Sequence, residues 1–253
     1  MTQKQKIFAQ WDVSPKVVAF STTRQGGVSK APYASFNLGM HVGDDHLLVA
    51  TNREALRRSL APNLEWQMLD QVHSCDVVNV DVAVADITAD ALFTSRKNLV
   101  CCVQTADCLP VFIAALDGTE VAMVHAGWRG LASGIVENAL AAMSTPADRL
   151  AIWLGPAIGP CHFEIGAEVK ARFFEDAASE VTEVALEKSF KPSENPGKYM
   201  ADLYAIVRLK LSALGVQAVS GGNYCTYCDE SSFFSYRRDA VTGRMINAIY
   251  IEA

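Results

Sequence analysis

The sequence predicts an α/β fold in which helices cover a mixed sheet. Short runs of Val, Ile and aromatic residues bounded by turn residues predict many strands. Fewer segments repeat apolar residues at helical spacing. Strands and helices alternate irregularly and several strands run consecutively, which favours a mixed sheet over a doubly wound Rossmann fold. We find no repeat, low-complexity tract or linker, so residues 1–253 are expected to form one domain.

The expected elements follow from local signals along the chain. Strands are predicted at residues 17–22, 66–72, 76–82, 99–103, 111–115, 121–125, 151–154, 218–220 and 245–251. Helices are predicted at residues 46–60, 131–143, 168–176 and 204–214. Asp44 and Asp45 mark the start of the first helix, and Pro146 stops the second. Asp202 is expected to cap the last helix, which Gly215 follows.

Composition and charge exclude several classes of protein. The net charge of -6 argues against a nucleic acid or an anionic membrane as partner. The longest apolar stretch, 99–116, is interrupted by Gln104, Asp107 and Pro110, so it does not read as a membrane span. The first residues lead into no apolar signal segment. Seven cysteines in a chain without an export signal indicate a reduced cytoplasmic protein, and Cys101 and Cys102 are expected to be core residues. We expect a monomer or a weak dimer.

Three residues with zinc-binding side chains follow or interrupt apolar runs. His73 follows the strand expected at 66–72, Cys108 interrupts a strongly apolar segment, and His125 ends the strand expected at 121–125. Imidazole and thiolate are zinc ligands, and three protein ligands leave a fourth position for water or substrate. The alternative for each residue alone is a buried thiol or an ordinary histidine.

Other polar residues near these three suggest supporting roles. Arg129 lies between a strand end and a helix expected to begin near Gly130, where anions bind. The tight turn after His125 is attributed to the freedom of Gly127. Asp107, beside Cys108, would orient a histidine. Gln71 would share a strand face with His73.

Two further segments carry weaker signals. Arg24 and Asn37 lie in a Gly-containing polar region that would suit phosphate but matches no phosphate-binding fingerprint. Cys225 and Cys228 form a lone CxxC pair, interpreted as two unlinked thiols because no second pair accompanies it.

Several of these segments together resemble one family, the YfiH-type proteins. They were once called laccase-domain or multicopper polyphenol oxidases and are now regarded as purine nucleoside phosphorylases; one bacterial branch is called peptidoglycan editing factor. The resemblance runs from STTRQGGVS at 21–29, through TADCLPV at 105–111, HAGWRG at 125–130 and LGPAIGP at 154–160, to FFSYRRD at 233–239. It implies a single domain of the YfiH-like cysteine hydrolase fold. Cys228 departs from the pattern expected of the family, and His162 is left outside the site.

The resemblance implies that His73, Cys108 and His125 form a catalytic zinc triplet, with copper the metal in older interpretations. The implied activities are phosphorolysis of adenosine, guanosine, inosine and methylthioadenosine, and deamination of adenosine. Nucleoside and phosphate would be the partners, with Arg129 binding phosphate, helped by Arg24 and Asn37. Gln71 would contribute to substrate binding, and we assign proton transfer to Asp107.

Three rival interpretations remain open. A hydrolase would use Cys108 as nucleophile and His125 as base, and in the peptidoglycan-editing role it would remove L-serine from a UDP-MurNAc precursor. A multicopper oxidase needs more ligands than five histidines provide. A non-enzymatic zinc scaffold predicts a closed four-ligand site, whereas the sequence shows only three good ligands.

Overall fold

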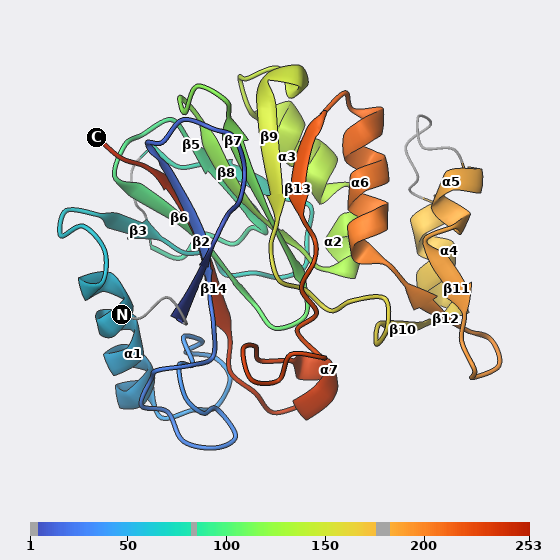
Figure 1. Cartoon of the computed structure of the whole chain (residues 1–253), viewed down its shortest axis with the longest axis horizontal. Helices are drawn as coiled ribbons and strands as arrows, with labels where there is room; N and C mark the ends of the chain where they lie inside the picture. The colour runs from blue at the N-terminus through green and yellow to red at the C-terminus, as the bar shows by residue number, and fades with distance from the viewer. Residues whose placement is uncertain (1–4, 82–84, 176–182) are drawn as a thin grey trace.

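Two larger sheets pack face to face, and helices cover their outer faces (Figure 1). The computed structural model describes residues 5–81, 85–175 and 183–253. The first sheet has the order β1 (Lys6–Phe8), β2 (Val17–Thr22), β14 (Met245–Ile251), β6 (Leu99–Thr105) and β3 (Glu65–Gln67). The second has the order β13 (Ala218–Gly221), β9 (Leu150–Leu154), β7 (Leu109–Ala115), β8 (Val121–Ala126), β5 (Ala91–Thr94) and β4 (Val77–Asn79).

Both sheets mix parallel and antiparallel pairs. The pairs β3–β6, β4–β5 and β9–β13 are parallel, whereas β14 lies antiparallel to both β2 and β6. A smaller sheet of β10 (Glu164–Gly166), β12 (Lys198–Ala201) and β11 (Phe190–Pro192) lies to one side. The α/β class with a mixed sheet and covering helices is therefore confirmed, although the strands divide between sheets instead of forming one.

Each outer face is covered by its own helices. Helix α1 (His46–Arg58) covers the first sheet, and α2 (Trp128–Ala132), α3 (Ile135–Ala142) and α6 (Leu203–Ala213) cover the second. The remaining helices are α4 (Ala167–Glu175), α5 (Glu183–Glu187) and α7 (Tyr236–Asp239), with a 3-10 turn at Ala147–Arg149. Cys101 packs between the sheets and Cys102 packs beneath α1, so the adjacent thiols face opposite sides of β6 as expected.

Several element boundaries follow the sequence signals. The bounds of β2 and β14 agree with the predicted strands. The carboxylate of Asp45 accepts the N–H of Leu47 at 2.8 Å, and that of Asp202 accepts the N–H of Ala205 at 3.0 Å. Such caps stabilise a helix by about 1 kcal/mol, which explains why both helices start where they do.

Other boundaries differ from expectation. The helix predicted at 131–143 is two helices, because Gly134 adopts a φ of 88° between them. The strand predicted at 66–72 ends at Gln67. The apolar run 99–116 is divided into two strands as predicted, β6 and β7. Pro110 itself, however, is the second residue of β7, where the chain has just crossed from one sheet to the other. Three parts of the predictions lie outside the described residues: the last residue of the strand predicted at 76–82, the last residue of the helix predicted at 168–176, and the N-terminal residues 1–4.

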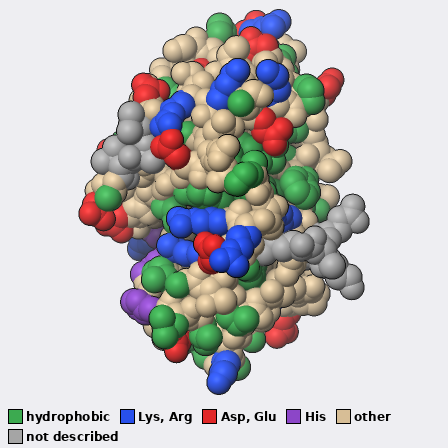
Figure 2. All heavy atoms as spheres, turned by 90° about the vertical axis from the view of Figure 1, so that its left-hand side faces the viewer, with side chains coloured by type: hydrophobic (Ala, Val, Ile, Leu, Met, Phe, Trp, Pro, Cys, Tyr) green, Lys and Arg blue, Asp and Glu red, His purple; other side chains and the backbone are tan. Residues whose placement is uncertain are grey.

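Acidic and basic side chains are both present on the face drawn in Figure 2. Within the ranges that the structure describes, no helix has the length and apolarity required to cross a bilayer.

Candidate metal centre

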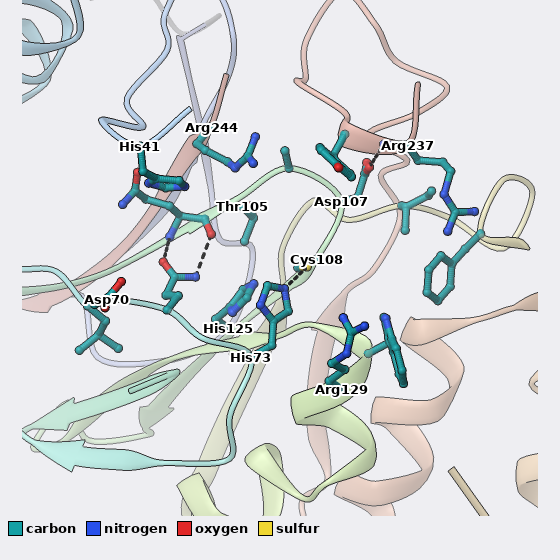
Figure 3. A pocket seen from close by; sticks show the side chains of 18 residues that line it. His41, Asp70, His73, Thr105, Asp107, Cys108, His125, Arg129, Arg237 and Arg244 are labelled. Carbon is teal, nitrogen blue, oxygen red and sulfur yellow. Dashed lines mark hydrogen bonds between the residues drawn. The ribbon is translucent and has the colours of Figure 1, made fainter. Parts of the chain in front are cut away.

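His73, Cys108 and His125 converge at one point, and their ligand atoms lie within 4.8 Å of one another. The Nε2 atom of His73 lies 3.7 Å from the Sγ atom of Cys108, as the dashed line in Figure 3 shows. The two imidazole rings meet edge to face, with centroids 4.8 Å apart. His125 is the penultimate residue of β8, Cys108 directly precedes β7, and His73 lies in the connection between β3 and β4.

A buried carboxylate that sequence reasoning missed orients His125. The Oδ1 atom of Asp90 lies 2.7 Å from Nδ1 of His125, and both side chains are almost fully buried. This hydrogen bond occupies Nδ1 and leaves Nε2 free to face Cys108. A carboxylate that accepts from the distal nitrogen of a ligand histidine fixes the ring and raises its basicity. The structure thus gives Asp90 the role that we expected of Asp107.

The turn that carries His73 is held by the same carboxylate. His73 has a φ of 62°, a left-handed conformation that costs a non-glycine residue about 1–2 kcal/mol. The Oδ2 atom of Asp90 accepts the backbone N–H groups of Ser74 at 2.6 Å and Val72 at 3.2 Å. Asp90 therefore fixes the backbone on both sides of one ligand and the ring of the other. The expected strand face shared by Gln71 and His73 does not exist, because this segment is not a strand.

Gly127 makes room for the triplet. A Cβ atom at this position would lie 2.7 Å from Cδ2 of His73 and 3.2 Å from Sγ of Cys108. Its φ of -64° is accessible to any residue. The reason for glycine here is therefore the close approach of the ligands, not the conformational freedom that the sequence suggested.

The residues of the triplet change one another's pKa values, and the thiol of Cys108 is favoured as the thiolate that binds a metal. Burial opposes the thiolate, but His125 and His73 outweigh it and lower the pKa of Cys108 to about 6. Burial likewise opposes a charge on His125, yet Cys108 and Asp90 raise the pKa of His125 to about 9. Burial disfavours the charged form of Asp90, but hydrogen bonds from His125 and Ser74 lower its pKa overall. The three groups therefore stabilise one another as thiolate, imidazolium and carboxylate.

This donor set fits zinc. Two imidazoles and one thiolate are ligands that zinc prefers, and three protein ligands leave a position for water or substrate. The steric room at Gly127 and the carboxylate behind His125 are both features expected of a built metal site.

The triplet lies on the wall of a cavity of about 600 Å³, within the range of small-molecule sites. Apolar side chains contribute part of the wall: Leu69, Trp128, Ile158, Phe163 and Tyr236. Arg129, Arg237, Arg244 and His41 add basic groups around the same space (Figure 3). The cavity therefore combines aromatic and apolar surface with an excess of cations, which suits a planar, partly apolar molecule and an anion.

The arginines differ in how they are engaged. The guanidinium of Arg129 stacks over the ring of Trp128 at 4.5 Å and pairs with no carboxylate of the described chain. That of Arg237 donates to the carbonyls of His162 and Glu164. That of Arg244 donates to carbonyls of its own turn. Of the three, Arg129 has the most hydrogen-bonding capacity left for a ligand.

Asp107 and Gln71 also line the cavity, but both are held by protein partners. The carboxylate of Asp107 accepts the hydroxyl of Thr226 and the backbone N–H of Arg237, each at 2.6 Å. The amide of Gln71 pairs at both ends with the backbone of Gln104, at 2.9 and 2.7 Å. Protein partners therefore hold both side chains in place at the cavity wall.

Arg24 and Asn37 do not line this cavity. The guanidinium of Arg24 donates to the carbonyls of Ala34 and Glu230 and lies over the ring of Phe234. Asn37 is fully buried, and its amide oxygen accepts the N–H groups of two turns. Both residues therefore organise loops, which explains the polar, Gly-containing composition that suggested a phosphate site.

Sequence reasoning missed several residues of the site. Asp90 is a charged residue beside the apolar run that forms β5, and this mismatch was a usable signal. Arg237 and Arg244 lie far along the chain from the triplet, and the sequence analysis assigned neither to the site. Gln104 interrupts the apolar β6, and its buried Oε1 atom has no hydrogen-bond partner in the described chain.

Comparisons with known proteins place the chain in a family. The model of a family described as multi-copper polyphenol oxidoreductase laccase matches residues 18–252. YfiH of Escherichia coli K12, a purine nucleoside phosphorylase, is 41% identical over 249 residues, covering 97% of this chain and 98% of that protein. The chain belongs to the YfiH family. A purine nucleoside phosphorylase of Pseudomonas aeruginosa is 44% identical over 242 residues, 96% of each protein.

The YfiH family also supplies the similar solved structures. A protein of Neisseria meningitidis superposes with a TM-score of 0.91 at 41% identity, covering 98% of this chain and all of that one. YlmD of Geobacillus stearothermophilus superposes with a TM-score of 0.86 at 34% identity, over 98% of this chain and 100% of that chain. The fold described above is therefore the YfiH fold.

Proposed function

We propose that this member of the YfiH family is a zinc-dependent purine nucleoside phosphorylase that also deaminates adenosine. Its nucleoside substrates would be adenosine, guanosine, inosine and methylthioadenosine, and the enzyme would act in the cytoplasm. The observation that carries the proposal is the position of Arg129: a guanidinium with no carboxylate partner in the described chain shares one cavity with the His73–Cys108–His125 triplet. The relatives named above as purine nucleoside phosphorylases support the phosphorylase part of the proposal.

Phosphorolysis needs an anion site and a pocket that orients the nucleoside. Arg129 would bind phosphate, because a guanidinium offers paired donors to phosphate oxygens. Helix α2 has only five residues, so its dipole adds little and the guanidinium carries the binding. Trp128 and Phe163 offer apolar surface for a purine ring. The Oε1 atom of Gln104, which lacks a partner in the described chain, would accept a hydrogen bond from a nucleoside hydroxyl or amino group.

Deamination of adenosine would use the same triplet. Zinc held by His73, Cys108 and His125 would supply Lewis-acid polarisation and activation of water. Asp90 would keep His125 in the ligand tautomer through the bond to Nδ1. Asp107 would exchange a proton with substrate from its position beside Cys108, through the lone pairs that its bonds to Thr226 and Arg237 leave open.

The direct test is to assay purified protein of known metal content on a nucleoside panel, with and without phosphate. The proposal expects free base and ribose 1-phosphate only when phosphate is present, and inosine from adenosine without phosphate. Cys108→Ala should remove one equivalent of metal and abolish both reactions, while Cys75→Ala serves as the matched control. Full zinc occupancy in Cys108→Ala would exclude Cys108 as a ligand.

A second candidate function is a cysteine hydrolase, such as one that removes L-serine from a UDP-MurNAc precursor. One observation favours it: Cys108, His125 and Asp90 form a hydrogen-bonded series of nucleophile, base and orienting carboxylate. Zinc and an acyl group compete for the same sulfur, because a thiolate bound to the metal shares its charge and loses nucleophilicity. The phosphorylase and hydrolase functions therefore make opposite predictions about metal removal.

Polyphenol oxidation, which the description of the matching family suggests, has the least support. A multicopper oxidase requires many histidine ligands for its copper ions. Of the five histidines in this chain, only His73 and His125 meet in a ligand group with Cys108. Oxidation of a phenol by the copper-loaded protein, at a rate above that of the zinc-loaded protein, would be needed to revive this function.

A further inference from the structure

A second group of metal-ligating side chains lies outside the cavity. Cys161, His162, Cys225 and Cys228 bring four ligand atoms within 4.8 Å of one another, and none of them lines the cavity described above. The first two residues follow β9, and the last two form the CxxC pair that precedes α7. Cys225 and Cys228 are free thiols, as the sequence predicted. The fold, however, brings a third thiol and an imidazole beside them from a segment more than sixty residues away.

The distances within this group match a tetrahedral site. The Sγ atom of Cys161 lies 3.3 Å from that of Cys228 and 3.7 Å from that of Cys225. The Nδ1 atom of His162 lies 3.2 Å from Sγ of Cys161 and 3.3 Å from Sγ of Cys228. A tetrahedron built with Zn–S of about 2.3 Å and Zn–N of about 2.0 Å has S···S edges of about 3.8 Å and S···N edges of about 3.5 Å. The sulfur atoms are too far apart for a disulfide, whose length is about 2.05 Å.

The surroundings of the group hold its members in place. The backbone N–H of Gly159 donates to Sγ of Cys225 at 3.2 Å. A Cβ atom at Gly159 would lie 3.2 Å from that sulfur and 3.4 Å from Sγ of Cys161, so glycine permits the approach of both thiols. The ring of His162 stacks on that of Tyr227 at 3.9 Å, which holds the imidazole beside the sulfur atoms.

From this geometry we infer that Cys161, His162, Cys225 and Cys228 bind a second zinc ion. Three thiolates and one imidazole complete a tetrahedral site, and a site with four protein ligands is structural, in contrast to the open triplet in the cavity. Each thiol releases its proton on binding, and the three thiolates leave the site with a net charge of minus one. The bound ion has no position for substrate.

The second ion would fasten one wall of the cavity. Ile158 and Phe163, beside the first pair of ligands, both line the cavity. Thr226, next to Cys225, donates its hydroxyl to Asp107 beside the catalytic thiol. The guanidinium of Arg237 donates to the carbonyl of His162 at 3.3 Å. Loss of the ion should therefore loosen the cavity wall and raise KM for nucleoside, without removing the ligands of the catalytic metal.

The test is metal stoichiometry in purified, desalted protein, measured by elemental mass spectrometry. The wild type should contain about two zinc ions per chain, and Cys108→Ser and Cys228→Ser should each contain about one. The double variant should contain essentially none. Cys75→Ser, which changes a thiol outside both groups, should retain both ions. Because Cys228 is exposed, its substitution should leave the protein folded.

A second measurement identifies the ligands without reference to activity. Cobalt loaded into Cys108→Ser should show intense thiolate-to-cobalt absorption from three sulfur ligands, and His162→Gln should shift that spectrum and speed metal release to a chelator by at least about tenfold. Wild-type protein that holds one zinc, lost completely in Cys108→Ser, would overturn the inference. So would a Cys161–Cys228 disulfide in freshly purified protein that contains no second metal.

Discussion

Asp90 and His125 form a buried hydrogen bond of 2.7 Å between Oδ1 and Nδ1, and the same carboxylate holds the turn of His73 through its other oxygen. One side chain therefore positions two of the three ligands of the candidate catalytic metal. Its own pKa is lowered because the hydrogen bonds from His125 and Ser74 outweigh its burial. Asp90 is thus the residue on which the geometry of the triplet most depends.

We predict that Asp90→Asn weakens zinc binding at the triplet by about 10- to 100-fold, the range found for partners of ligand histidines. The amide cannot supply two acceptor oxygens, so either His125 or the His73 turn loses its partner. Competition with a chromophoric chelator measures the affinity. Asp76→Asn, at an exposed carboxylate nearby, is the control. Unchanged affinity in Asp90→Asn would show that the bond to His125 does not tune the site.

Arg129→Ala should raise the KM for phosphate by about 10- to 100-fold, because a charge-assisted hydrogen bond contributes about 1.5–3 kcal/mol. Phosphate-independent deamination of adenosine should change far less. Initial rates over a series of phosphate concentrations give the comparison, and Arg58→Ala, at an exposed arginine of α1, is the control. Equal loss of both reactions would indicate that Arg129 is structural.

Gln104→Leu should raise the KM for nucleoside by about tenfold, as expected when one net hydrogen bond of about 1 kcal/mol or somewhat more is lost. The substitution keeps the size of the side chain but removes the Oε1 acceptor, which has no partner in the described chain. The hydrogen bonds between the backbone of Gln104 and the side-chain amide of Gln71 remain, so the midpoint of thermal unfolding should not change. A nucleoside KM equal to that of the wild type would remove Gln104 from substrate binding.

In metal-free protein, Cys108 should react with iodoacetamide along a titration curve with a midpoint near pH 6, because His125 and His73 lower the pKa of Cys108 to about 6 against the effect of burial. The thiolate is the reactive form, so the rate is constant above that pH and falls about tenfold per pH unit below it. Peptide mass spectrometry separates this thiol from the others. Cys101, whose pKa burial raises far above the ordinary value, should stay unmodified. A midpoint above pH 8 would contradict the pairing with the histidines.

Removal of metal separates the two enzymatic candidates. Chelation should abolish nucleoside turnover if the triplet acts through zinc, and added zinc, enough to fill both sites, should restore it. A free cysteine hydrolase should instead keep or increase its activity in chelator and become sensitive to alkylation. A covalent acyl adduct on Cys108, trapped while activity persists in chelator, would exclude the zinc-phosphorylase function and favour the hydrolase.

The sequence by itself determined features that depend on a few neighbouring residues. The bounds of β2 and β14, the caps Asp45 and Asp202, and the opposite directions of Cys101 and Cys102 all follow from local periodicity and capping chemistry. The ligand types of the triplet were equally readable, since a histidine or thiol beside an apolar run stands out against its surroundings.

Only the tertiary structure decided which distant residues meet. Asp90 reaches His125, and Cys161 reaches Cys228, because the order of strands in the sheets brings their connections together, and no local pattern encodes that order. Arg24 and Asn37 carry the residue types of an anion site, but loop carbonyls and turn N–H groups already occupy them. Polar residues satisfy whichever partner the fold brings within reach, so side-chain type defines what a residue can bind, and its neighbours in space decide what it does bind.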